Sequence, residues 1–418
     1  LTMKRKAPLL IFVIALGLVL CLNCSGILSP YLAAASQSDQ YAMEAVVKAN
    51  NLFAYDLYAL IAKDKGNLFI SPYSITSALA MTYAGARGAT AEQMEQALHF
   101  DLAGPGLHPG FYGLMTQFNA AGKSCQLAVA NALWAQQGIM FYPAFIETTR
   151  EYYEAGFKEV NYAADPEHAR QIINGWVEDK TNHKIIELLK SGTIDELTRL
   201  VLTNAIYFKG KWQQQFKPEQ TSTAPFYVSA DKTADVPLMY QTAEFMYAEN
   251  KQIQLIELPY SGDDIVMDIV LPKSRNDFNA LEADLNPGLV DSWLALLRLQ
   301  QAEVYLPRFK TEKSLSLASY LQRLGMIDAF DENNADFSGM SDLFLYITHV
   351  IHKAFVEVNE EGTEAAAATA VVMNTKAAAF EETPIFRADH PFLFLIRHKG
   401  SGCILFMGRM VDPRQEVN

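Results

Sequence analysis

Two serines and one histidine are the side chains of this 418-residue sequence best suited to hydrolysis. Ser71 and Ser74 lie in the stretch SPYS, and His352 lies far along the chain in VIHK. Together with an aspartate they could form a catalytic triad, in which the histidine takes the proton of the attacking serine. The sequence, however, contains no G-x-S-x-G, Walker A or H-E-x-x-H motif. Because the serines open an apolar helix, we interpret them as part of a buried hydrogen-bonded cluster and predict that the protein is not an enzyme.

Metal and cofactor chemistry have no support in the spacing of possible ligands. His349 and His352 are three residues apart in a predicted strand, which sends their side chains to opposite faces. Cys125 and Cys403, the cysteines outside the N-terminal segment, are too isolated in sequence to form a disulfide framework. We therefore predict no metal site, no cofactor and no bond between these two cysteines.

The N-terminus has the pattern of a targeting segment. Lys4, Arg5 and Lys6 precede an apolar run over residues 7–22, and small residues follow at 33–35. This pattern is typical of a secretory signal peptide, so residues 1–35 predict export. A retained membrane anchor and lipidation at Cys24 stay open as alternatives. The net charge of −13, without any basic cluster, argues against a nucleic-acid partner.

The elements that must position these residues change in character along the chain. Residues 41–64 have helical apolar spacing, Ser71 is a helix cap with Pro72 at the first helical position, and residues 166–189 predict two helical stretches. Residues 313–325 also favour a helix. β-Branched and aromatic runs predict strands at 201–212, 252–260, 264–272, 302–309, 352–359, 391–398 and 402–410. Helices early and strands late indicate an α+β fold.

One segment fits neither class. Residues 360–373 read EEGTEAAAATAVVM, which is rich in the best helix former but has no apolar stripe to bury. Gly362 and the β-branched pair at 371–372 weaken the helical interpretation further. The segment could therefore be helix or strand.

This segment resembles the reactive loop of the serpins, and the resemblance extends over the chain beyond residue 35. NLFISPYSITSALAMTYAGARGAT, VLTNAIYFKGKW, LPRFK, FSGM, HPFLFLIRH and ILFMGRMVDP occur in the order that the family shows. The resemblance implies one serpin domain over residues 36–418, with a large central mixed sheet and an exposed loop at about 360–385. The N-terminal signal and Cys24 together point to a secreted, prokaryotic-like member.

The resemblance implies a suicide-substrate inhibitor. A serine protease cleaves the loop, the loop inserts into the central sheet as a new strand, and the protease stays trapped in a covalent 1:1 complex. The sequence is compatible with insertion, because the stretch from Thr363 to Val372 contains no proline and only one charge, Glu364. The hinge implied by the family comprises Glu360, Gly362, Thr363, Glu364, Ala365, Ala366, Ala367 and Ala368. A non-inhibitory serpin that binds or carries a ligand is the alternative.

The cut site depends on how the loop is counted. Fifteen residues from Gly362, with that glycine counted first, lies Lys376, so the bond Lys376–Ala377 predicts a trypsin-like target. Counting back from HPF instead puts Phe380 before the cut, and the bond Phe380–Glu381 predicts a chymotrypsin-like target. Cleavage among the alanines at 377–379 would suit an elastase-like protease. We favour Lys376–Ala377, because the hinge count sets the length of the inserted strand.

Several further positions are implied by the resemblance alone. Ser71, Ser74, Asn204 and His352 correspond to a polar cluster beneath the point where the sheet opens, and Trp212 corresponds to a tryptophan at the top of that opening. No basic patch for a glycosaminoglycan is present. We expect a monomer that forms latent protein or loop–sheet polymers on heating, since the active form is kinetically trapped.

Overall fold

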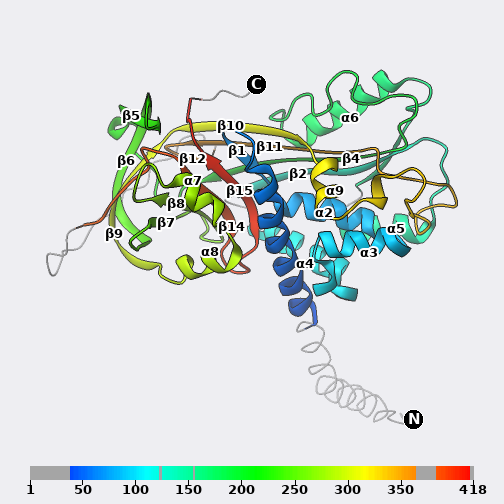
Figure 1. Ribbon diagram of the computed structural model, residues 1–418, viewed down its shortest axis with the longest axis horizontal. Helices are drawn as coiled ribbons and strands as arrows, with labels where there is room; N and C mark the ends of the chain where they lie inside the picture. The colour runs from blue at the N-terminus through cyan, green and yellow to red at the C-terminus, as the bar shows by residue number, and fades with distance from the viewer. Residues whose placement is uncertain (1–37, 122–124, 154–155, 364–382, 415–418) are drawn as a thin grey trace, which may run out of the picture.

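The computed structural model describes residues 38–121, 125–153, 156–363 and 383–414 (Figure 1). The predicted targeting segment with Cys24 and residues 364–382 with both candidate bonds lie outside the described residues. In the described part of the chain, no helix combines the length and the apolar character needed to cross a bilayer.

A six-stranded mixed sheet runs through the molecule and contains the segment that leads into the loop. Its strand order is β10-β11-β12-β4-β2-β3. β11 is parallel to β4 and β2 is parallel to β3, whereas the other pairs are antiparallel. The strands are β2 (Cys125–Gln136), β3 (Phe157–Val160), β4 (Leu200–Lys211), β10 (Phe309–Ser316), β11 (His349–Asn359) and β12 (Gly362–Thr363).

A second, nine-stranded sheet packs at one end of the first. Its order is β1-β15-β14-β8-β7-β6-β9-β13, with β5 added at β6. The strands are β1 (Leu68–Ile70), β5 (Ser222–Ser229), β6 (Lys232–Glu249), β7 (Ile253–Pro259), β8 (Ile265–Pro272), β9 (Arg298–Pro307), β13 (Ile385–Arg387), β14 (Phe392–His398) and β15 (Ile404–Met410). β13 resumes the chain beyond the loop, so both ends of the loop are anchored in sheets.

Helices cover both faces of the six-stranded sheet (Figure 1). Alternate residues of β2 explain this: Leu127 and Val129 pack on the main core, whereas Ala128 and Ala130 pack on a smaller core under α6. Residues 38–61 are helical. The other helices are α2 (Pro72–Tyr83), α3 (Gly88–Ala97), α4 (Leu107–Ala121), α5 (Pro143–Tyr153), α6 (Pro166–Lys180), α7 (Phe278–Ala283), α8 (Pro287–Leu294) and α9 (Ala318–Arg323), with short 3-10 turns at 100–102, 104–106, 218–220 and 328–330.

The α+β fold, the strand predicted at 201–212 and the cap at Ser71 are confirmed. Two helix predictions are wrong in part. Residues 313–316 continue β10 because they pair with β11, and α9 begins only at Ala318. The second helical stretch before Leu189 is absent, since Asn182, His183 and Glu187 adopt positive φ angles that no helix contains.

Candidate functional site

The point where β11 and β4 separate is the candidate site. Along residues 349–355 and 201–207 the two strands pair directly. Above this level β12 lies between them, with Gly362 opposite Asn359 and Lys211, and Thr363 opposite Val358 and Gly210. Gly362 and Thr363 of the predicted hinge therefore already occupy the sheet as a short central strand.

Gly362 is required by its surroundings. Its φ angle is +147°, a region that side chains rarely adopt. A Cβ atom placed on it would lie 2.1 Å from the carbonyl oxygen of Gly210 and 2.6 Å from the Cα of Lys211. Only glycine allows the backbone to approach β4 this closely.

An aromatic pair closes the top of the opening. The ring of Trp212 stacks on that of Tyr260 with centroids 4.5 Å apart, and its indole N–H donates to the carbonyl of Asn359 at 3.0 Å. The Tyr260 hydroxyl is hydrogen-bonded to that of Thr363 at 2.8 Å, and Thr363 is fully buried. The aromatic pair thus contacts Asn359 at the end of β11 and Thr363 at the end of β12.

A buried carboxylate fixes the turn before the hinge. Glu360 accepts hydrogen bonds from the Nε of Arg308 at 2.7 Å and from the Thr221 hydroxyl at 2.5 Å, and it forms an ion pair with Arg308. Burial favours the neutral acid, but the hydrogen bonds from Arg308 and Thr221 outweigh it, so the pKa of Glu360 lies below its ordinary value. Glu360 is therefore ionised and paired at neutral pH.

A polar cluster lies lower in the same sheet, where β11 still pairs with β4. The Asn204 amide donates to Ser74 Oγ at 2.6 Å and to Asn131 Oδ1 at 2.5 Å, while Ser74 Oγ donates to the same oxygen at 3.0 Å. Ser71 Oγ donates to the carbonyl of Leu405 at 2.7 Å. The cluster therefore connects α2 to β2, β4 and β15.

His352 completes the cluster as a neutral ring. Its Nε2 accepts from the backbone N–H of Ser71 at 3.2 Å, so the proton is on Nδ1, which donates to Asn204 Oδ1. Burial lowers the pKa of His352 to about 3. The hydroxyl of Ser71 is hydrogen-bonded to Leu405 and Ser74 and not to the ring, and none of the described residues places a carboxylate against the ring. Among the described residues, these hydrogen bonds join β11 to β4 and to the start of α2, and they do not have the serine–histidine–carboxylate arrangement of a catalytic triad.

Our sequence reasoning missed Asn131, although it is central to the cluster. Its Nδ2 donates to the carbonyl of Ser74 at 3.0 Å, and its Oδ1 accepts from both Ser74 and Asn204. A signal was present, because Asn131 is a polar residue within the apolar run LAVANALWA. Arg308, Thr221 and Tyr260, which hold the hinge, had no such signal.

The other predicted positions are the loop residues and the two cysteines. Glu364, Ala365, Ala366, Ala367 and Ala368 of the hinge lie outside the described residues, as do Lys376, Ala377, Phe380 and Glu381. Cys125 and Cys403 are separate buried thiols.

Comparison with known proteins decides the family. Residues 48–413 match the family described as serpin (serine protease inhibitor). The chain is a serpin. Human Serpin B8 is 45% identical over 378 residues, and bovine leukocyte elastase inhibitor is 45% identical over 382 residues; each match covers 89% of this chain and 100% of the relative.

Solved serpin structures agree with this fold. Uncleaved ovalbumin superposes with a TM-score of 0.80 at 30% identity, covering 88% of this chain and 100% of that one. Maspin superposes with a TM-score of 0.82 at 29% identity, covering 89% and 100%. The serpin fold predicted from the sequence is thus confirmed.

The comparisons contradict two of our expectations. The relatives are mammalian, so a prokaryotic-like member is wrong. Secretion is contradicted as well. Serpin B8 and leukocyte elastase inhibitor are each matched along their entire length by 89% of this chain. The match to the family begins at residue 48. These relatives therefore contain no counterpart of residues 1–35, the segment on which the prediction of secretion, and its membrane-anchored and lipidated alternatives, rested.

Proposed function

We propose that this serpin is an inhibitor that traps a serine protease as a covalent 1:1 complex by inserting its cleaved loop between β11 and β4. One observation carries the proposal: β12 already lies between these strands, with hydrogen-bonded neighbours on both sides. The strand to be added therefore has its first two residues in register.

The chemistry of the segment that follows supports insertion. Between Thr363 and Val372 the sequence has no proline, and the side chains that share the face of Thr363 are uncharged and no larger than valine. Entry of these side chains into the sheet requires little loss of rotamer freedom and no burial of a charge on that face. A binding or carrier role without insertion would not need these properties.

We propose Lys376–Ala377 as the bond that the protease cleaves, with a trypsin-like enzyme as the target. A second candidate is cleavage further along the loop, among the alanines at 377–379 by an elastase-like protease or at Phe380–Glu381 by a chymotrypsin-like protease. It is favoured by the similarity to a protein named leukocyte elastase inhibitor, at 45% identity. The two candidates share the mechanism and differ only in the residue that enters the specificity pocket.

The test is incubation of the purified protein with trypsin, chymotrypsin and elastase, each followed by denaturing electrophoresis and mass spectrometry of the released peptide. A gel-stable complex with trypsin and a peptide that begins at Ala377 is the expected result. A peptide that begins at Glu381 would move the cut to the second candidate. The matched variants Lys376→Ala and Phe380→Ala separate the two candidates. Lys376→Ala should abolish the complex with trypsin if Lys376 precedes the cut, and Phe380→Ala should abolish the complex with chymotrypsin if Phe380 does. Cleavage by every protease without a stable complex would refute the inhibitor proposal.

A further inference from the structure

The turn between β7 and β8 is held by the turn between β14 and β15. Residues 260–264 connect the first pair of strands, and residues 399–403 connect the second. The backbone N–H of Lys399 donates to the carbonyl of Asp264 at 2.8 Å, and its ammonium donates to the carboxylate of Asp263 at 3.2 Å. Lys399 therefore contacts the β7–β8 turn through both its backbone and its side chain.

The β7–β8 turn carries the tyrosine that contacts the hinge. Tyr260 is its first residue, and its carbonyl accepts from the N–H of Asp263 at 3.0 Å. Asp263 has a φ angle of +60°, a left-handed conformation that persists where surrounding contacts support it. On one side the N–H of Ser261 donates to the carbonyl of Lys211 in β4 at 2.7 Å. The shape of the turn sets the position of the Tyr260 hydroxyl, which is bonded to Thr363.

On the other side, Lys399 is the outer member of a network of opposite charges. Its ammonium lies 3.3 Å from a carboxylate oxygen of Glu257, and Glu257 also pairs with the guanidinium of Arg397 at 2.6 Å. Arg397 pairs in addition with Asp268 at 2.5 Å. Glu257 and Asp268 are buried and lie opposite each other on β7 and β8. Because two buried carboxylates share one guanidinium, Lys399 supplies the second positive charge that they need.

Lys399 is charged at neutral pH. Burial disfavours the ammonium, but the carboxylates of Glu257 and Asp263 outweigh it and raise the pKa of Lys399 above its ordinary value. Glu257 is fixed in the sheet, whereas Asp263 belongs to the turn. The ammonium between them therefore draws the turn toward the sheet.

We propose that Lys399 is a positioning residue for the hinge: its contacts with the β7–β8 turn hold Tyr260 where the hydroxyl keeps Thr363 between β11 and β4. The inference rests on the proposed function, since a hinge that already lies in the sheet gives the cleaved loop an earlier start of insertion. Earlier insertion leaves the covalent intermediate less time to hydrolyse. The contact thus favours trapping of the protease over cleavage of the serpin as a substrate.

The test measures how much protein is cleaved as a substrate for each molecule trapped in complex. In Lys399→Gln this ratio should rise about two- to fivefold, the range expected for a surface ion pair. Lys399→Arg keeps the charge and should restore the ratio of wild type. The thermal midpoint of unfolding should be equal in the three proteins, whereas a merely structural role would change the midpoint and not the ratio.

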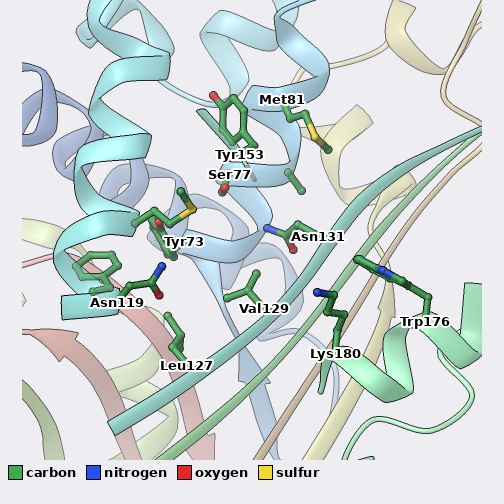
Figure 2. A pocket seen from close by; sticks show the side chains of 13 residues that line it. Tyr73, Ser77, Met81, Asn119, Leu127, Val129, Asn131, Tyr153, Trp176 and Lys180 are labelled. Atoms are coloured by element: carbon green, nitrogen blue, oxygen red, sulfur yellow. The ribbon is translucent and has the colours of Figure 1, made fainter. Parts of the chain in front are cut away.

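Two control variants remove a lysine elsewhere. Lys273 pairs with Glu249 at 2.9 Å at the other end of β8, and its side chain is 39% exposed, against 40% for Lys399. Lys273→Gln therefore breaks a comparable ion pair that does not contact the turn. Lys180→Gln removes a positive charge from the lining of the cavity beside β2 (Figure 2), to which no member of the charge network contributes. Both variants should keep the ratio of wild type.

Tyr260→Phe tests whether the effect passes through the tyrosine hydroxyl. This change removes the bond to Thr363, so adding Lys399→Gln to it should raise the ratio no further. An equal further rise in the double variant would overturn the proposal. So would a ratio in Lys399→Gln no higher than that in Lys273→Gln.

Hydrogen exchange separates this inference from the proposed function, because it needs no protease. In uncleaved Lys399→Gln the peptide that contains Gly362 and Thr363 should exchange its amide hydrogens about two- to fivefold faster than in wild type. Unchanged exchange would overturn the positioning role even in a protein that traps proteases. Faster exchange in a protein that forms no protease complex would refute the proposed inhibitor and support the positioning of the hinge.

Discussion

Protonation of His352 should open the sheet. In the closed state Nε2 of His352 accepts a hydrogen bond from the backbone N–H of Ser71. A proton on that nitrogen would set two N–H groups against each other inside a fully buried cluster. Burial of the ring also lowers the pKa of His352, to about 3. Once the strands separate and water reaches the ring, the pKa returns to about 6.5.

The sign and size of the effect follow from the two pKa values. Between them the open state binds more protons than the closed state, so the closed state loses stability as the pH falls below about 6.5. Its stabilisation by neutral His352 is complete above that pH. At pH 5 an exposed histidine is protonated about 30 times more often than not, which favours opening by about 2 kcal/mol relative to pH 7.5.

The assay measures the rate at which the protein converts to latent protein or polymers on mild heating at pH 5 and at pH 7.5. Native gels follow the polymers, and the remaining active protein is measured as its ability to form a protease complex after return to pH 7.5. A roughly 30-fold faster conversion at pH 5 is expected. His352→Gln removes this titration and keeps every other acid-sensitive group, including Asp268, whose pKa burial raises to about 6. The ratio of rates should therefore fall sharply in the variant. Equal ratios in wild type and His352→Gln would refute the reasoning.

Three further changes test the site. Thr363→Arg would bury an unpaired charge at several kcal/mol, so the protein should be cleaved as a substrate with little complex on a denaturing gel, whereas Thr363→Val should lose only about 1 kcal/mol and keep most of its complex. Glu360→Lys places two positive charges together at Arg308 and should speed polymerisation on native gels more than Glu360→Gln does; equal rates would count against the role of this ion pair. Asn131→Ala leaves buried donors of the polar cluster without an acceptor, a loss of about 1–3 kcal/mol, and should lower the thermal midpoint, while Asn131→Gln, which keeps both the acceptor oxygen and the donor nitrogen, should lower it less.

Gly362 and the serines of the polar cluster could be singled out from residue type and spacing, whereas the hinge and the roles of Asn204 and His352 came from the family resemblance. Gly362 stood out in a segment without an apolar stripe, and Ser71 was visible as a helix cap before a proline. The structure adds why glycine is required, since the contact with Gly210 depends on the register of β12 and β4.

The partners of these residues could not be predicted in the same way. Arg308 meets Glu360, and Asn131 meets Ser74, across separations of 52 and 57 residues. Such contacts are set by which strands become neighbours, and periodicity within one segment does not reveal that. The export prediction failed for a related reason, because a basic and apolar pattern is a compositional signal that no contact within the fold checks.

The short strand β12 also fixes what the rest of the loop would meet on entry. Each further residue would advance one position along both neighbours. Six residues after Thr363 comes Thr369; six residues before Gly210 comes Asn204, and six before Val358 comes His352. Asn204 and His352 are the pair that the new strand must part. On the proposed insertion, the hydroxyl of Thr369 would therefore arrive, on the same face as Thr363, at the level of the hydrogen bond between His352 and Asn204. The hydroxyl can both donate and accept a hydrogen bond, so it could replace the bond lost between His352 and Asn204. The register of β12 therefore matches the inserting segment to the residues that hold β11 and β4 together.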